Sequence, residues 1–281
     1  METTVTSTTS AHDERPGGGP GGGRARLRQR TLRTDRWWLG PTLTTLGLAT
    51  FLVYGAVRVF QQDHYWVQEH HYLTPFYSPC LAAQCVPDAS LLGRVPWEFP
   101  PFLPYALISL PILLLFRVTC YYYRKAYYRS VWQAPTACAV REPHSSYTGE
   151  TRPLMLPQNG HRYFFYAAGA IVLINTWDML VPFFHGTEGG FGIGVGNLIM
   201  LTNVLLLWAY TFGCHSCRHI MGGRLRSFSR SPVRYWFWTR ISTLNDRHML
   251  FGWLSIASLM ATDAYIALVA SGTITDLRIL N

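Results

Sequence analysis

The chain has 281 residues, of which 49% are hydrophobic and only 14% are charged, whereas a soluble domain usually has about 25% charged residues. This composition excludes an ordinary soluble globular protein and indicates a membrane protein. The net charge of +9 comes almost entirely from arginine. These arginines flank apolar runs, and no nucleic-acid motif accompanies them, so we do not interpret the charge as a nucleic-acid interface.

The first segment, residues 1–36, is rich in Thr, Ser, Gly and Pro up to residue 23 and basic after it. Such a composition cannot bury a hydrophobic core, so we predict a disordered basic N-terminal tail. Residues 37–281 are predicted to form one membrane anchor domain.

Five apolar runs follow, and each reaches the roughly 20 residues that a bilayer-crossing helix needs. They lie near residues 39–60, 102–122, 163–184, 191–214 and 249–270. We therefore predict an all-α integral membrane protein with a bundle of five transmembrane helices. Arginines cluster before the first run, after the second, and between the fourth and fifth. The positive-inside rule then places the N-terminus in the cytoplasm, and an odd number of spans places the C-terminus outside.

The cysteines divide between the two sides of the membrane in this topology. Cys80 and Cys85 lie in a Pro-rich outer loop, where an oxidising compartment favours a disulfide between them. The other four lie at the inner face and should stay reduced, available as metal ligands or as inert packing. These four are Cys120, Cys138, Cys214 and Cys217.

Two aspartates and one arginine of the later predicted spans need an explanation. Asp178 follows His161 by 17 residues, about 25 Å along a helix, and Asp263 follows His248 by 15 residues, about 22 Å. Both carboxylates are therefore expected in the outer half of the membrane, either as part of a proton path or as interfacial groups held by water or helix-terminal hydrogen bonds. Arg117, near the end of the second run, is expected to extend to the inner surface.

The stretch Cys214-His215-Ser216-Cys217-Arg218-His219 places four metal-ligating residues within six positions. Successive residues of a helix advance by about 100°, so its cysteines share one face and its histidines share another. One regular helix cannot direct all four at one metal, and two ligand sets stay open. The first set consists of His215, His219, Cys120 and Cys138. The second set consists of Cys214, Cys217, His161 and His248.

Three metal chemistries compete for such residues. Structural zinc accepts two cysteines and two histidines, but its usual finger-like spacing is missing here. Haem b uses two histidines and no cysteine, whereas a Rieske-type 2Fe-2S cluster uses two cysteines on one iron and two histidines on the other. The alternative without metal is that the reduced cysteines fill apolar space and the histidines lie at the membrane interface. A zinc clasp would suit a non-redox membrane protein such as a transporter or scaffold.

Three stretches, Thr119–Arg129, Cys214–His219 and Leu244–Met249, resemble a known family. From about residue 36 onward the chain is similar to the cytochrome-b-like, SdhC-type membrane anchor of actinobacterial succinate dehydrogenase, respiratory complex II. The resemblance implies a multi-pass protein of the bacterial cell membrane in a three-subunit complex. A flavoprotein subunit oxidises succinate, an iron–sulfur subunit relays electrons, and the anchor, which does not itself oxidise succinate, passes them to menaquinone. The iron–sulfur subunit is expected to dock on the inner face.

Related di-haem anchors need a histidine pair near each membrane face. Here the outer face offers His185 and the histidines of the outer loop, which favours a Rieske-type 2Fe-2S centre at the inner face, with haem b as the alternative. The quinone is expected to bind beside that centre. Its candidate contacts are His161, Arg162, Trp236 and His248.

Overall fold

The computed structural model describes residues 33–281 apart from residues 91, 97, 99, 101, 141–142, 144–159, 186–189 and 224. The predicted tail lies almost entirely outside the described residues. The α-helices are α1 (Leu39–Gln61), α2 (Leu110–Thr119), α3 (Tyr121–Ser130), α4 (His161–Leu180), α5 (Val195–Phe212), α6 (His215–Gly222), α7 (Pro232–Asp246) and α8 (His248–Ala270). Short 3-10 helices are η1 (Pro87–Ala89), η2 (Tyr105–Ile108) and η5 (Val181–Phe184). The strands are β1 (Trp66–Val67), β2 (Tyr72–Leu73), β3 (Ile193–Gly194) and β4 (Arg278–Leu280).

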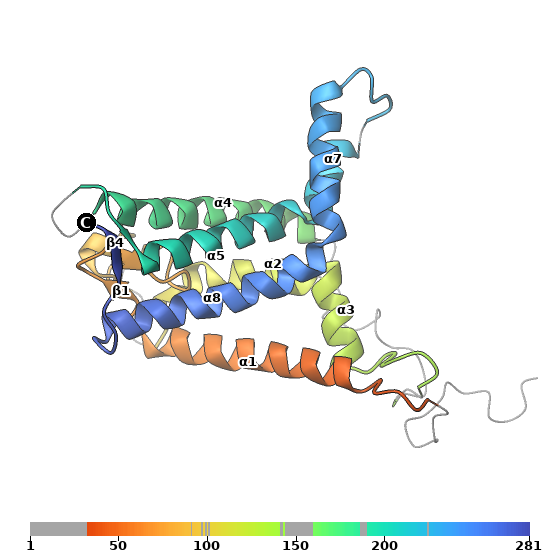
Figure 1. Cartoon of the computed structure of the whole chain (residues 1–281), viewed down its shortest axis with the longest axis horizontal. Helices are drawn as coiled ribbons and strands as arrows, with labels where there is room; N and C mark the ends of the chain where they lie inside the picture. The colour runs from red at the N-terminus through yellow and green to blue at the C-terminus, as the bar shows by residue number, and fades with distance from the viewer. Residues whose placement is uncertain are drawn as a thin grey trace, which may run out of the picture.

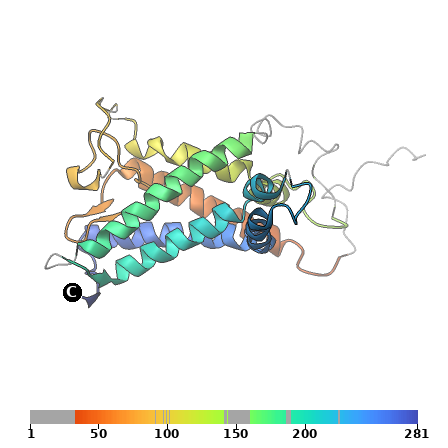
Figure 2. The same ribbon diagram turned by 90° about the horizontal axis from the view of Figure 1, so that it is seen from above.

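Four helical stretches in the described part of the chain are long and apolar enough to cross a membrane: Leu39–Gln61, His161–Phe184, Val195–Phe212 and His248–Ala270. They run side by side along the long axis of the molecule, whereas α3 and α7 turn across one end of it (Figure 1). In Figure 2, α6 and α7 are seen nearly end-on at that same end. We call this end the α7 end. The opposite end, which holds the strands and the C-terminus, is the loop end. The prediction of an all-α membrane protein is confirmed.

The second predicted span, 102–122, is not one helix, and the count of five spans is not confirmed. It begins as η2, continues as the ten-residue α2, and stops where Cys120 adopts an extended backbone with ψ 134°. Pro104 and Pro111 lack the backbone N–H that a helix interior needs, which explains the irregular start. The fourth run is also shorter than predicted, because residues before Val195 pair as β3 with β4.

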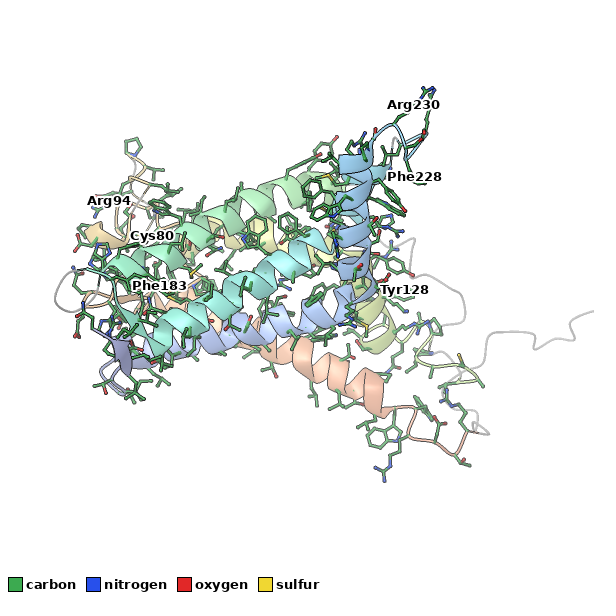
Figure 3. All side chains as sticks on the ribbon, turned by 45° about the horizontal axis from the view of Figure 1, so that its top comes forward. Cys80, Arg94, Tyr128, Phe183, Phe228 and Arg230 are labelled. Carbon is green, nitrogen blue, oxygen red and sulfur yellow. A yellow bond between two sulfur atoms is a disulfide. The ribbon has the colours of Figure 1, made fainter. Side chains whose placement is uncertain are left out.

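The segment between α1 and η2, which includes β1, β2 and η1, closes the loop end, and we call it the cap. Tyr72, Phe76 and Tyr77 are almost fully buried in it, and Cys80 and Cys85 are joined by a disulfide. Figure 3 shows Cys80 near this end and Phe228 at the α7 end of the molecule. The cap is therefore an ordered part of the fold.

Breaks between helices concentrate at the α7 end. The chain turns at Cys120 between α2 and α3, at Gly213 and Cys214 between α5 and α6, and at Arg247 between α7 and α8. Cys120 and Cys214 have nearly the same backbone conformation, with φ −66° at both and ψ 134° and 142°. At Cys120 and Cys214 a helix that runs along the bundle is followed by one that crosses its end, and at Arg247 the order is reversed. The crossing of α3 and α7 is visible in Figure 1.

Candidate metal centre at the α7 end

Four side chains, Cys120, His161, Cys214 and His248, meet where these helices turn. Cys120 and Cys214 are the N-cap residues of α3 and α6, and His161 and His248 are the first residues of α4 and α8. His161 Nε2 lies 3.0 Å from Cys214 Sγ, and Cys120 Sγ lies 3.4 Å from His248 Nε2. We call these four residues the Cys/His quartet. It combines side chains from four helix starts that are far apart in the sequence.

The tautomer of His161 follows from its second contact. Thr119 Oγ1 lies 2.7 Å from the carbonyl oxygen of Leu115 and 2.7 Å from His161 Nδ1. A hydroxyl has a single hydrogen, and the Leu115 carbonyl can only accept it, so Nδ1–H must donate to Oγ1. The lone pair of His161 is therefore on Nε2, the nitrogen that faces Cys214. A neutral imidazole held in this way by a second hydrogen bond is the usual arrangement of a metal-binding histidine.

His248 is only 1% exposed and is held by packing. Its ring stacks on Tyr210 with centroids 4.8 Å apart and planes 7° from parallel. Its Nδ1 has no hydrogen-bond partner among the described residues. Gly213 allows the close approach, because a Cβ there would lie 2.8 Å from the carbonyl oxygen of Ala209 and 3.1 Å from His248 Nδ1.

The thiols of the quartet are buried, Cys120 at 2% and Cys214 at 1% exposure. Burial raises the pKa of Cys214 to about 12 and also raises the pKa of Cys120. Without a bound cation both groups are neutral thiols near pH 7, and Cys214 can donate its proton to the Nε2 lone pair of His161. Metal binding would release these protons and leave thiolate ligands.

A cavity of about 730 Å³ borders the quartet. All four quartet residues line it, together with polar and aromatic side chains from α3, α4, α6 and α7. These are Tyr121, Tyr122, Arg124, Arg162, Tyr163, His215, Ser216, His219 and Asn245, with Thr119 at the end of α2. The volume lies in the range of small-molecule sites.

The other predicted ligands lie elsewhere. Cys138 is exposed, and its carbonyl accepts a hydrogen bond from Arg33. His215 and His219 are exposed on α6, and His219 Nδ1 lies 3.0 Å from Arg162 Nη2. Cys217 is buried, does not line the cavity, and makes no side-chain hydrogen bond within the described part of the chain. Across the described ranges, no group of three or more His, Cys, Asp or Glu side chains is arranged to hold one metal ion.

Comparison with known proteins identifies the family. Residues 39–272 match the family model of the actinobacterial succinate dehydrogenase subunit SdhC. A chain of the Mycobacterium smegmatis Sdh1 complex in the apo form is 60% identical and superposes with a TM-score of 0.84, over 92% of this chain and 97% of that one. No curated protein matches. The chain belongs to the actinobacterial SdhC family. It is a multi-pass membrane subunit of succinate dehydrogenase and works with the other subunits of that enzyme.

The quinone contacts expected for this SdhC subunit divide between two places. His161, Arg162 and His248 all line the cavity. Trp236 lies on α7, is 54% exposed, and does not line it. Arg240 lies over the Trp236 ring at 5.3 Å from its centroid.

The two acidic residues of the SdhC spans are both buried and bonded to the cap. Asp263 is fully buried and accepts hydrogen bonds from Arg58 at 2.6 Å and Tyr54 at 2.5 Å, and also from Thr74. Asp178 accepts a hydrogen bond from Ser78. Each carboxylate therefore ties a long helix to the cap at the loop end.

Arg117 was expected at the inner surface but is inside the protein. It is 8% exposed and contacts α3, α5 and α8. The sequence contains no signal for this position beyond the charge itself, because the side chains that contact Arg117 come from three other helices.

Proposed function

We propose that this SdhC subunit passes electrons from the iron–sulfur subunit of succinate dehydrogenase to menaquinone through a Rieske-type 2Fe-2S centre held by the Cys/His quartet. The supporting observation is the meeting of two thiols and two imidazoles from four helix starts, at 3.0 and 3.4 Å across each Cys–His contact. Bound there, such a centre would take up and release single electrons, at a potential that histidine ligation raises.

The donor set fits two irons better than one metal ion. Structural zinc needs four ligands around one point, and the described residues contain no group of three arranged in that way. A Rieske-type centre spreads its ligands over two irons, so here Cys120 and Cys214 would hold one iron and His161 and His248 would hold the other. This pairing takes one cysteine from each of the two ligand sets left open by the sequence.

Haem b is the second candidate, because the cavity of about 730 Å³ borders both His161 and His248. A haem held by two imidazoles has no use for the thiols. In the structure each imidazole Nε2 faces a thiol sulfur. We therefore favour the 2Fe-2S centre over haem.

Spectroscopy of the complex purified from membranes tests the proposal. Wild-type complex should show the low-field EPR signal of a histidine-ligated 2Fe-2S centre, and His161→Ala and His248→Ala should each abolish it. His215→Ala and His219→Ala are matched controls, because both histidines lie at the same end but are exposed. A Soret band in place of the signal would establish haem b, and a signal that survives both quartet substitutions would refute the ligand assignment.

In this proposal the cavity beside the quartet binds the quinone head group. Arg162 and the tyrosines Tyr121 and Tyr122 supply hydrogen-bond donors there. Arg162→Met should raise the quinone KM several-fold and leave the EPR signal in place. Phe237→Ala, on the exposed side of α7, is the control, and an equal KM change in both variants would contradict this position.

We assign the α7 end to the cytoplasm, as the arginine distribution predicts, so the iron–sulfur subunit docks there.

For an outer proton path, Asp178 is better placed than Asp263. Asp178 lines a cavity of about 10 Å³ with Asn203 and Thr262, about the volume of one water molecule. Asp263 is instead paired with Arg58. Asp178→Asn should slow quinone reduction without loss of the EPR signal, and an unchanged rate would remove this residue from the path.

A further inference from the structure

A buried arginine lies beside the Cys/His quartet, and no carboxylate among the described residues pairs with it. Arg117, in the last turn of α2, is 8% exposed. None of the ion pairs formed by the described residues includes it. An unpaired charge inside a protein is strongly destabilising unless another group compensates it. A negative charge that develops nearby would compensate this arginine.

The guanidinium is fixed in place by neutral groups. Nη1 donates to Tyr123 Oη at 2.6 Å, and Nη2 donates to Ser255 Oγ at 3.1 Å. The guanidinium carbon also lies 4.7 Å from the centroid of the Tyr210 ring, a cation–π contact. These contacts orient Arg117 but do not neutralise it.

The same contacts bring the charge to the quartet. The Tyr210 ring, with Arg117 over it, stacks on His248 at 4.8 Å. Cys120 follows Arg117 by three residues and lies with Tyr123 and Tyr210 in one buried cluster. No described carboxylate pairs with the guanidinium, and burial limits screening by water, so its field at the quartet is screened less than that of an exposed charge.

We propose that Arg117 sets the reduction potential of the centre held by the quartet, by stabilising its reduced form. This inference rests on the proposed function. With two thiolates and two neutral imidazoles, a 2Fe-2S centre is uncharged when oxidised and gains one negative charge with the electron delivered by the iron–sulfur subunit. A fixed cation nearby favours the form that bears that charge. Arg117 is a positioning residue in this role, because it acts on the centre through its field.

The test is an EPR-monitored redox titration of the intact complex. Arg117→Gln should shift the reduction equilibrium toward the oxidised form at least tenfold, a fall in potential of about 59 mV for one electron. Arg117→Lys keeps the charge and should restore most of the wild-type potential. Lys125→Gln, an exposed cation on α3, is the control and should leave the potential unchanged, because water screens it.

A second variant keeps the test decisive if Arg117→Gln does not assemble. Ser255→Asp places a carboxylate against Arg117 Nη2, which neutralises the charge while giving the buried arginine a partner. We expect a thermal stability at or above wild type together with the lower potential. A purely structural role for Arg117 predicts the same stability with no change in potential, and that result would overturn the inference. Absence of any 2Fe-2S signal in the wild-type complex would instead refute the proposed function.

Discussion

The buried ion pair between Arg58 of α1 and Asp263 of α8 allows a quantitative test of how the loop end is held together. Arg58 Nε lies 2.6 Å from Asp263 Oδ2, and the two side chains are 7% and 0% exposed. Asp263→Asn removes the negative charge and leaves the guanidinium buried without its partner. Such a change usually lowers the free energy of unfolding by about 3–5 kcal/mol. For a chain of this size that corresponds to a fall in Tm of about 6–20 °C.

The double variant Arg58→Leu/Asp263→Leu separates the charge from the other contacts. With both charges gone, the remaining cost comes from the hydroxyls of Tyr54 and Thr74, which lose their acceptor, at about 1–3 kcal/mol each. The double variant should therefore lose less stability than the single variants Arg58→Leu and Asp263→Leu added together. The apparent Tm of the purified complex and protease cleavage of the cap measure the effect, with the exposed Asp63→Asn as the control. An Asp263→Asn complex as stable as this control would refute the reasoning.

Three further substitutions test other parts of the structure. Gly196→Ala should lower the free energy of unfolding by about 1–3 kcal/mol, because the new Cβ would lie 2.7 Å from Tyr72 Cζ. A thermal scan that matches wild type would contradict this close contact. Thr119→Val removes the acceptor for His161 Nδ1–H and should weaken metal retention about 10–100-fold, measured as iron content after chelator treatment, whereas Thr119→Ser should retain iron. Cys138→Ser should leave the iron content unchanged and should change the free energy of unfolding by no more than about 0.5 kcal/mol, because the side chain is exposed. A loss of iron would assign Cys138 a ligand role.

The long helices could be predicted from the sequence because apolar composition over some 20 residues is a local property. The second span could not, because its outcome depends on where Pro104, Pro111 and Cys120 interrupt the backbone. At Cys120 the chain leaves the helix with ψ 134° and restarts at Tyr121. The apolar run and the tyrosines that follow it look continuous in the sequence, but α2 and α3 point in different directions (Figure 1).

The candidate site shows the same division between local and long-range information. All members of the Cys/His quartet could be named from the sequence, because cysteines and histidines at span ends are visible there. Their grouping could not, since a rule of about 100° per residue assumes a continuous helix. Cys214 is extended, with ψ 142°, so its side chain no longer follows the helical spacing to Cys217. That single backbone change places Cys214 opposite His161, while Cys217 packs away from the cavity.

The electrostatic surroundings of the quartet have two sources that respond differently to mutation. Its members lie at the N-terminal ends of α3, α4, α6 and α8, where the helix dipole is positive and favours thiolates or any other anion. Because this contribution belongs to the backbone, it persists in every side-chain variant, and Arg117→Gln should still assemble the centre. The arginine adds a whole charge to that fixed background, so its removal should be seen in the potential more than in the iron content. If the variant lost iron in proportion to its change in potential, the helix ends would be contributing little, and the thiolates would depend on Arg117 itself.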